Sequence, residues 1–131
     1  MARPATGRPT EGELEILQVL WDRRAGTVRQ VHGVVRRRRR CGFTSTLKLM
    51  QIMLAKGLLR RDESRRPQVY QAAVARARVQ RNFLRDLLRR LFGGSANLMV
   101  ARLLDESDLT REELAELDQL IAAHARKKGP G

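Results

Sequence analysis

Hydrophobic side chains recur every three or four residues along most of the chain, a spacing that predicts a mainly helical protein. Helix starts are indicated by capping boxes, in which a threonine precedes Glu or Gln by three residues: Thr10 with Glu13, Thr27 with Gln30 and Thr110 with Glu113. A further helix is expected from Thr44, as its N-terminal cap, to Gly57, as a left-handed C-terminal cap. Two more are predicted over 75–91 and 97–104.

The segment between residues 58 and 71 has a different pattern. Leu58–Arg61 and Gln68–Gln71 are short extended runs on either side of the charged turn Asp62–Pro67, which is typical of a β-hairpin. Three short helices followed by a hairpin is the order of a winged helix-turn-helix, whose third helix enters the DNA major groove. We therefore predict a mainly α fold with a small β-hairpin, comprising a winged-helix DNA-binding region (1–73) and a helical dimerisation region (74–131).

Charge indicates the kind of partner. The net charge is +13, and residues 1–72 hold 16 basic and 6 acidic side chains whereas residues 73–131 hold 11 and 8. Arginine predominates, and its planar guanidinium suits phosphate. With 42% hydrophobic residues the chain can form a core, so it is not a disordered basic tail. A polyanionic partner such as double-stranded DNA is favoured, although an arginine-rich solubilising surface is the alternative.

Other classes of protein are disfavoured. The longest uncharged run, Leu91–Ala101, is too short to span a bilayer, and the first eight residues lack the apolar segment of a secretory signal, so we expect a cytoplasmic protein. Cys41 is the only cysteine, and His32 and His124 have no neighbours at ligand spacing. Glycine-rich phosphate loops and catalytic triads are not found. We expect no enzyme activity, no cofactor and no metal.

The predicted third helix has two distinct faces. Its apolar face carries Thr46, Leu49, Met50 and Met53, and its opposite, acid-free face carries the candidate DNA-binding residues Thr44, Ser45, Leu47, Lys48 and Gln51. Gln can bond adenine and Lys guanine, whereas hydroxyls near a helix N-terminus suit phosphate. Arg65 and Arg66 in the hairpin turn are predicted phosphate contacts. The simpler interpretation of Lys48 and Gln51 is a solvated helix face.

Several residues have two interpretations. The block Arg36–Arg40 either contacts the DNA backbone or forms a solvated loop. Tyr70 either packs against the third helix or bonds a phosphate through its hydroxyl. Cys41 beside arginines is a reactive thiolate or, as we favour, an inert thiol. Trp21 is expected in the core.

The C-terminal helices are expected to form a homodimer, because their apolar stripes exceed what one short chain needs. The predicted dimer residues are Phe83, Leu87, Leu91, Leu103, Leu114, Leu117, Leu120 and Ile121. A protein that reads a palindrome needs such a symmetric interface. An architectural nucleic-acid binder without sequence specificity is the alternative, and an adaptor that binds another protein through these helices is a third, more remote one.

Several segments resemble the penicillinase-repressor family, the BlaI, MecI and CopY type regulators. The segments are Pro9–Leu17 with Leu20-Trp21, Thr44–Thr46 through Lys56–Leu58, Val69-Tyr70, Asn97–Val100 and Leu109–Leu114. The resemblance implies a homodimeric repressor of a palindromic operator, relieved when a membrane-bound sensor metallopeptidase promotes cleavage. By that resemblance the cut would fall near Arg102-Leu103.

The chain also departs from the family pattern. The family commonly has Thr at the place of Lys48 and Arg at the place of Ile52, and its loop before the third helix is shorter and less basic than Arg36–Arg40. The cysteine-rich tail of the copper-responsive relatives is missing, so induction by metal through that route is not expected.

Overall fold

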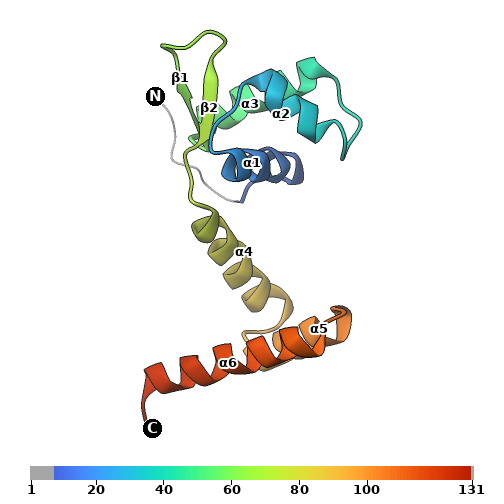
Figure 1. Cartoon of the computed structure of the whole chain (residues 1–131), viewed down its shortest axis with the longest axis vertical. Coiled ribbons are helices and arrows are strands. Elements are labelled where there is room, and N and C mark those ends of the chain that lie inside the picture. Colours follow the sequence, from blue (N-terminus) through green and yellow to red (C-terminus); the bar gives the residue numbers. More distant parts are fainter. Residues whose placement is uncertain (1–7, 131) are drawn as a thin grey trace. The chain divides into compact units, whose positions relative to one another are not determined.

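The computed structural model describes residues 8–130, and within them it contains six helices and one two-stranded sheet (Figure 1). The elements are α1 (Glu11–Arg23), α2 (Val28–Val35), α3 (Phe43–Lys56), β1 (Leu59–Asp62), β2 (Val69–Ala72), α4 (Arg76–Leu91), α5 (Ala96–Glu106) and α6 (Arg111–Lys128). This confirms the predicted mainly α fold with a small hairpin. The first seven residues, which bear on the expected lack of a secretory signal, lie outside the described part.

The helix starts follow from local side-chain chemistry. All three capping boxes are present: the threonine hydroxyl accepts from the backbone N–H of the Glu or Gln, and the side-chain oxygen of that Glu or Gln accepts from the backbone N–H of the threonine. The prediction that Thr44 caps α3 is wrong. Gly42 is the N-cap, without a side-chain bond, and Phe43 is the first residue of the helix; its ring packs edge-on against His32 with the ring centres 5.7 Å apart. The expected left-handed cap at Gly57 is confirmed, with φ of 83°.

The hairpin lies where the sequence predicts it. β1 and β2 pair antiparallel, with Arg61 opposite Tyr70 in the register. An isolated β-bridge also joins Tyr70 to Gly26, which lies between α1 and α2. The N–H of Gly26 donates to the Tyr70 carbonyl at 3.0 Å, and the N–H of Tyr70 donates to the Gly26 carbonyl at 2.8 Å. This bridge ties the chain between the first two helices to the hairpin.

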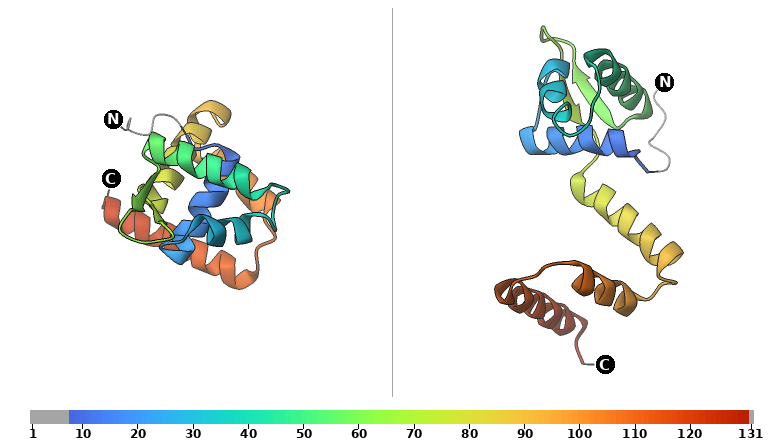
Figure 2. Two further views of the ribbon diagram at one scale, coloured as in Figure 1. Left: turned by 90° about the horizontal axis from the view of Figure 1, so that it is seen from above. Right: turned by 90° about the vertical axis from the view of Figure 1, so that its right-hand side faces the viewer.

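One hydrophobic core joins α1, α2, α3 and the hairpin (Figures 1 and 2). Its fully buried members are Ile16, Leu17, Leu20, Val31, Met50 and Met53, and Tyr70 is 3% exposed beside them. Tyr70 is therefore a packing residue. Trp21 is not in the core as expected but half-buried at its edge, where the indole N–H donates to the carbonyl of Val74 at 2.9 Å.

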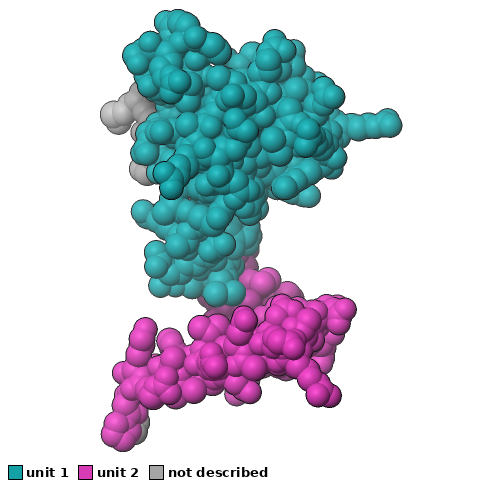
Figure 3. Space-filling model, viewed as in Figure 1, with its two compact units in different colours: residues 1–85 teal, residues 86–131 magenta. Residues whose placement is uncertain are grey.

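The chain divides into two compact units, Met1–Arg85 and Asp86–Gly131, and the division falls inside α4 (Figure 3). The first unit contains the whole predicted winged-helix region and the first turns of α4. There Val79 is buried, and Arg76 forms an ion pair of 2.6 Å with Asp22. The first part of α4 is thus fixed to the α1 end of the winged helix.

The second unit has little interior of its own. Among residues 86–130 no side chain is fully buried, and leucines such as Leu91 (69% exposed) and Leu120 (66%) are mostly accessible. No helix in the described part is both long enough and apolar enough to cross a membrane. The unit therefore presents amphipathic helices whose apolar sides have little cover within one chain.

Candidate nucleic-acid interface

The outward face of α3 gathers the residues predicted to contact DNA. Thr44, Ser45, Lys48 and Gln51 are exposed, and Leu47 is half-buried. The spacing of three and four residues places these side chains on one side of the helix. On the other side Thr46, Met50 and Met53 are buried and Leu49 is half-buried. The core therefore fixes which face of α3 meets solvent, and that face carries hydrogen-bonding groups and one positive charge.

The N-terminal end of α3 is held against α2. His32 Nδ1 lies 2.8 Å from Thr46 Oγ1, and Cys41 Sγ lies 3.7 Å from the same hydroxyl. The guanidinium of Arg29 lies 5.4 Å from the centre of the Phe43 ring, a cation–π contact. These contacts orient the first turn of α3, the part of a recognition helix that reaches base edges.

The C-terminal end of α3 is held against α1 by an ion pair whose carboxylate is buried. Lys56 Nζ donates to Glu13 Oε2 at 2.8 Å, and Glu13 is 1% exposed. Burial alone would raise the pKa of Glu13, but the hydrogen bonds from Lys56 and from the Thr10 backbone N–H outweigh it and lower the pKa. Sequence reasoning assigned Glu13 only to the capping box, because nothing local indicates a partner 43 residues away.

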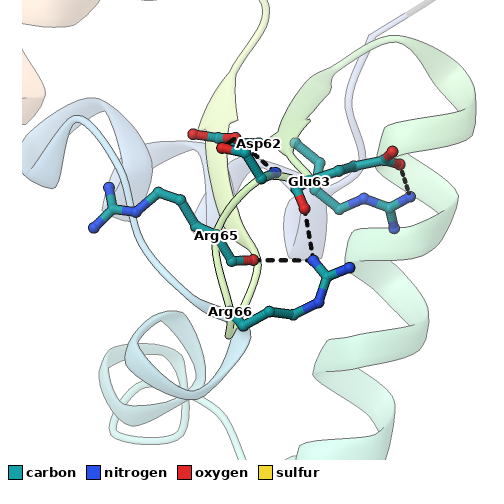
Figure 4. A network of polar contacts seen from close by, with 6 residues as sticks. Asp62, Glu63, Arg65 and Arg66 are labelled. Atoms are coloured by element: carbon teal, nitrogen blue, oxygen red, sulfur yellow. Dashed lines mark hydrogen bonds and ion pairs between the residues drawn. The ribbon is translucent and has the colours of Figure 1, made fainter.

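The hairpin turn, here called the wing tip (Asp62–Pro67), contains a network of hydrogen bonds (Figure 4). Both the N–H and the hydroxyl of Ser64 donate to Asp62 Oδ1, at 3.0 and 2.6 Å, and they lower the pKa of Asp62. Arg66 donates from Nη1 to the carbonyls of Glu63 and Arg65, at 2.6 and 3.1 Å. Arg65 extends from the turn without such a backbone bond (Figure 4). Both arginines remain exposed, which suits contact with a phosphate.

The wing tip also borders a cleft at the start of α2. Arg65, Arg66 and Pro67 line this cleft together with Arg23 at the end of α1 and with Thr27 and Gln30 of the second capping box. The lining contains three arginines and no acidic residue. The first N–H groups of a helix have no partner inside the helix, so this is an electropositive hollow suited to an oxyanion. Arg23 is not predicted from the sequence to be part of this cleft. Its position at the end of the first helix is the one feature of the sequence that could have indicated it.

Arg36–Arg40 form the turn between α2 and α3, here called the arginine turn. Arg39 lies over α1, where its Nε is 3.9 Å from Glu15 Oε2. Its Nη1 packs close to Gly12, so that a Cβ added at this glycine would lie only 2.6 Å from Nη1. All five members, Arg36 to Arg40, are exposed. The helix does fray into a turn here, as expected.

Comparison with known protein families gives a match over residues 9–123 to the family described as Penicillinase repressor. The matched stretch includes α3, the wing tip and most of α6. The chain belongs to the penicillinase-repressor family. The resemblance noted in the sequence is thereby confirmed.

A relative is found among curated proteins. The chain is similar to the Latilactobacillus sakei protein described as "Uncharacterized 16.5 kDa protein in ptsI 3'region". The two are 23% identical over 120 residues, which make up 92% of this chain and 82% of that protein. The similarity therefore extends through both units.

Membership of the penicillinase-repressor family makes this chain a DNA-binding transcriptional repressor by class. The family consists of regulators rather than enzymes. Among the described residues no group of three or more His, Cys, Asp or Glu side chains is placed to hold a metal ion. The α3 face and the arginines of the wing tip offer hydrogen-bonding groups and positive charge.

Proposed function

We propose that this chain is a homodimeric repressor that binds a palindromic operator through α3 and the wing tip. One observation carries the proposal: the exposed face of α3 is free of acid and, apart from Leu47 and Ile52, polar, while its opposite face is buried and both its ends are fastened to neighbouring helices. A helix fastened in this way can enter the major groove without losing its orientation. The partner, double-stranded DNA, places the protein in the cytoplasm.

Within this proposal the residues divide into two groups. Lys48 and Gln51 reach base edges, where Lys can bond guanine and Gln adenine. Thr44 and Ser45 near the helix start, with Arg65 and Arg66 of the wing tip, contact phosphates and set the position of the protein on the duplex. Leu47, half-buried on the same face, is suited to an apolar contact with a thymine methyl group.

Homodimerisation through the C-terminal unit is supported by the exposure of its apolar side chains. Seven of the eight proposed residues belong to this unit by sequence, and the five most exposed of them are Leu91 (69%), Leu103 (55%), Leu114 (43%), Leu120 (66%) and Ile121 (63%). Leu87 is 41% exposed and Leu117 half-buried. The eighth, Phe83, lies in the first unit, with the guanidinium of Arg8 at 5.2 Å from its ring centre. Covering these side chains with a second copy removes apolar surface from water.

Derepression by proteolysis is the remaining part of the proposal. Arg102 and Leu103 are exposed on α5, a helix of 11 residues without a buried side chain. Short helices with little packing open locally at low free-energy cost, and opening is what a peptidase needs. A membrane-bound sensor metallopeptidase is the proposed partner for this step, by its association with other members of the family.

The test is a protection footprint on the DNA upstream of the chain's own gene, repeated with random duplex as competitor. A specific dimer is expected to protect two half-sites related by a dyad and to prefer the operator by roughly a thousandfold or more. Equal affinity for operator and random duplex at every salt concentration would instead identify an architectural nucleic-acid binder.

A further inference from the structure

The arginine turn contains more positive charge than the fold uses. Arg39 is the member that fastens the turn, through Glu15 and the surface of Gly12 on α1. Its neighbours Arg36, Arg37, Arg38 and Arg40 are exposed, and no ion pair between any of them and the described carboxylates is found. Four like charges held this close repel one another unless an anion screens them.

The turn lies next to the proposed reading helix. Arg39, Arg40 and Cys41 line one cleft together with Ser45 and Thr46 in the first turn of α3. Ser45 is exposed on the face proposed to contact DNA. A duplex that meets Ser45 therefore passes beside the arginine turn.

The second basic group, at the wing tip, lies at the other end of α2. Arg65 and Arg66 share a cleft with Thr27 and Gln30 at the start of this helix, whereas Arg36 is its C-terminal cap. Eight residues at 1.5 Å each make α2 about 12 Å long. The major groove of B-DNA is also about 12 Å wide. The length of α2, which separates the two arginine groups along the helix, is therefore comparable to the width of one major groove.

We propose that the arginine turn binds the phosphate backbone on the side of the major groove opposite to the strand held by the wing tip. The duplex is then gripped on both walls while α3 reads between them. This inference rests on the proposed entry of α3 into the major groove. It assigns to Arg36, Arg37, Arg38 and Arg40 a sequence-independent contribution to affinity.

The test compares Arg36→Gln/Arg37→Gln/Arg38→Gln with Arg78→Gln/Arg81→Gln/Arg85→Gln, a control that removes the same charge from exposed positions of α4. The logarithm of the binding constant for a random duplex is measured against the logarithm of salt concentration. We expect the slope of the turn variant to fall by about 2 to 3, at roughly 0.9 per lost phosphate, and the control to keep the wild-type slope. If the triple variant has a lower melting temperature than the wild type, the single variants Arg37→Gln and Arg38→Gln are used instead, and each is expected to lower the salt slope by about 0.9.

Phosphate ethylation interference on the operator then locates the contacts. The turn variant is expected to lose interference on the wall away from the wing tip and to keep it beside the wing tip. The inference is overturned if the turn variant keeps both the wild-type salt slope and the wild-type interference pattern. It is also overturned if the turn variant loses affinity for single-stranded RNA but keeps the wild-type salt slope on duplex DNA. Because the slopes are measured on random duplex, they test the turn even if the operator proposal fails on its own.

Discussion

The buried carboxylate of Glu13 joins two helices that are far apart in the sequence. It accepts the N–H of Thr10 at 2.8 Å in the capping box of α1 and also binds Lys56 in the last turn of α3. Lys56 is about half exposed while Glu13 has almost no contact with water. A carboxylate in such a position is stable only while its hydrogen bonds are kept. One side chain therefore both caps the start of α1 and holds the last turn of α3 against α1.

The lowered pKa of Glu13 predicts how stability depends on pH. Because the pKa is below its value of 4.5 in an unfolded chain, the ionised carboxylate stabilises the fold above about pH 4.5, and this contribution is lost as the pH falls through the folded-state pKa. Glu13→Gln is expected to lower the free energy of unfolding at pH 7 by about 1–3 kcal/mol, with the deficit shrinking in acid. Denaturant unfolding from pH 3 to 7 measures this.

Glu11→Gln is the matched control, because Glu11 is an exposed carboxylate in the same first turn of α1. It is expected to change stability by no more than a few tenths of a kcal/mol at any pH. A deficit of Glu13→Gln that stays constant from pH 7 to pH 3 would contradict the role assigned to the ion pair.

At the scale of elements, the sequence predicts those helix and strand boundaries that depend on residues close together in the chain. Thr27 and Gln30 are three residues apart, so the start of α2 is visible in the sequence; the hairpin is visible because polar turn residues separate two extended runs. The sequence places the N-cap of α3 at Thr44, two residues after the actual N-cap Gly42, because Gly42 has no side chain whose capping bond a sequence pattern could reveal.

The candidate site shows the same limit. The residues of the α3 face follow from helical periodicity, and they do share a surface. The contribution of Arg23 to the wing-tip cleft depends on the bridge between Gly26 and Tyr70, a pairing of single residues 44 positions apart that leaves no periodic signal. Contacts between distant residues, rather than secondary structure, are what the sequence alone does not reveal.

The two elements proposed to contact DNA, α3 and the wing tip, predict different mutational effects. Lys48→Ala and Gln51→Ala are expected to relax base preference at particular positions of each half-site, by about 1–3 kcal/mol at those positions. Arg65→Ala and Arg66→Ala are expected to weaken all duplexes about equally and to lower the salt slope by about 1 each. Binding to a set of operators with every single base substitution separates the two outcomes. A uniform loss from all four variants would show that α3 does not read bases.

At the scale of the whole molecule, the exposed apolar faces of α5 and α6 predict that a second copy of this chain covers them. Leu117→Asp introduces a charge among the leucines of α6 and is expected to convert the dimer into monomers, because burial of an unpaired carboxylate is costly. Sedimentation velocity measures the mass. Gln119→Asp, which adds the same charge at an exposed polar position of α6, is expected to remain dimeric. Dimers of Leu117→Asp would move the interface away from this residue.

The proposed homodimer also predicts how tightly the operator is bound. Two half-sites on one face of B-DNA lie about 34–36 Å apart, so two reading heads bind together only if the C-terminal helices hold them. Linking two binding events raises the overall affinity by a factor that is often 100-fold or more. A cut in α5 would remove that advantage while leaving α1 to α3 and the hairpin, with their own core, intact.

A chain that ends at Arg102 is therefore expected to keep a folded winged helix but to bind the operator at least about 100-fold more weakly than the full chain. Circular dichroism checks the fold, and gel shifts at several protein concentrations measure the affinity. Fusing the shortened chain through a flexible linker to an unrelated dimeric coiled coil is the control, and it is expected to recover tight binding because it restores the tether without α6. If the shortened chain alone holds the operator as tightly as the full chain, the C-terminal helices are not the tether, and cleavage near Arg102-Leu103 is not the switch.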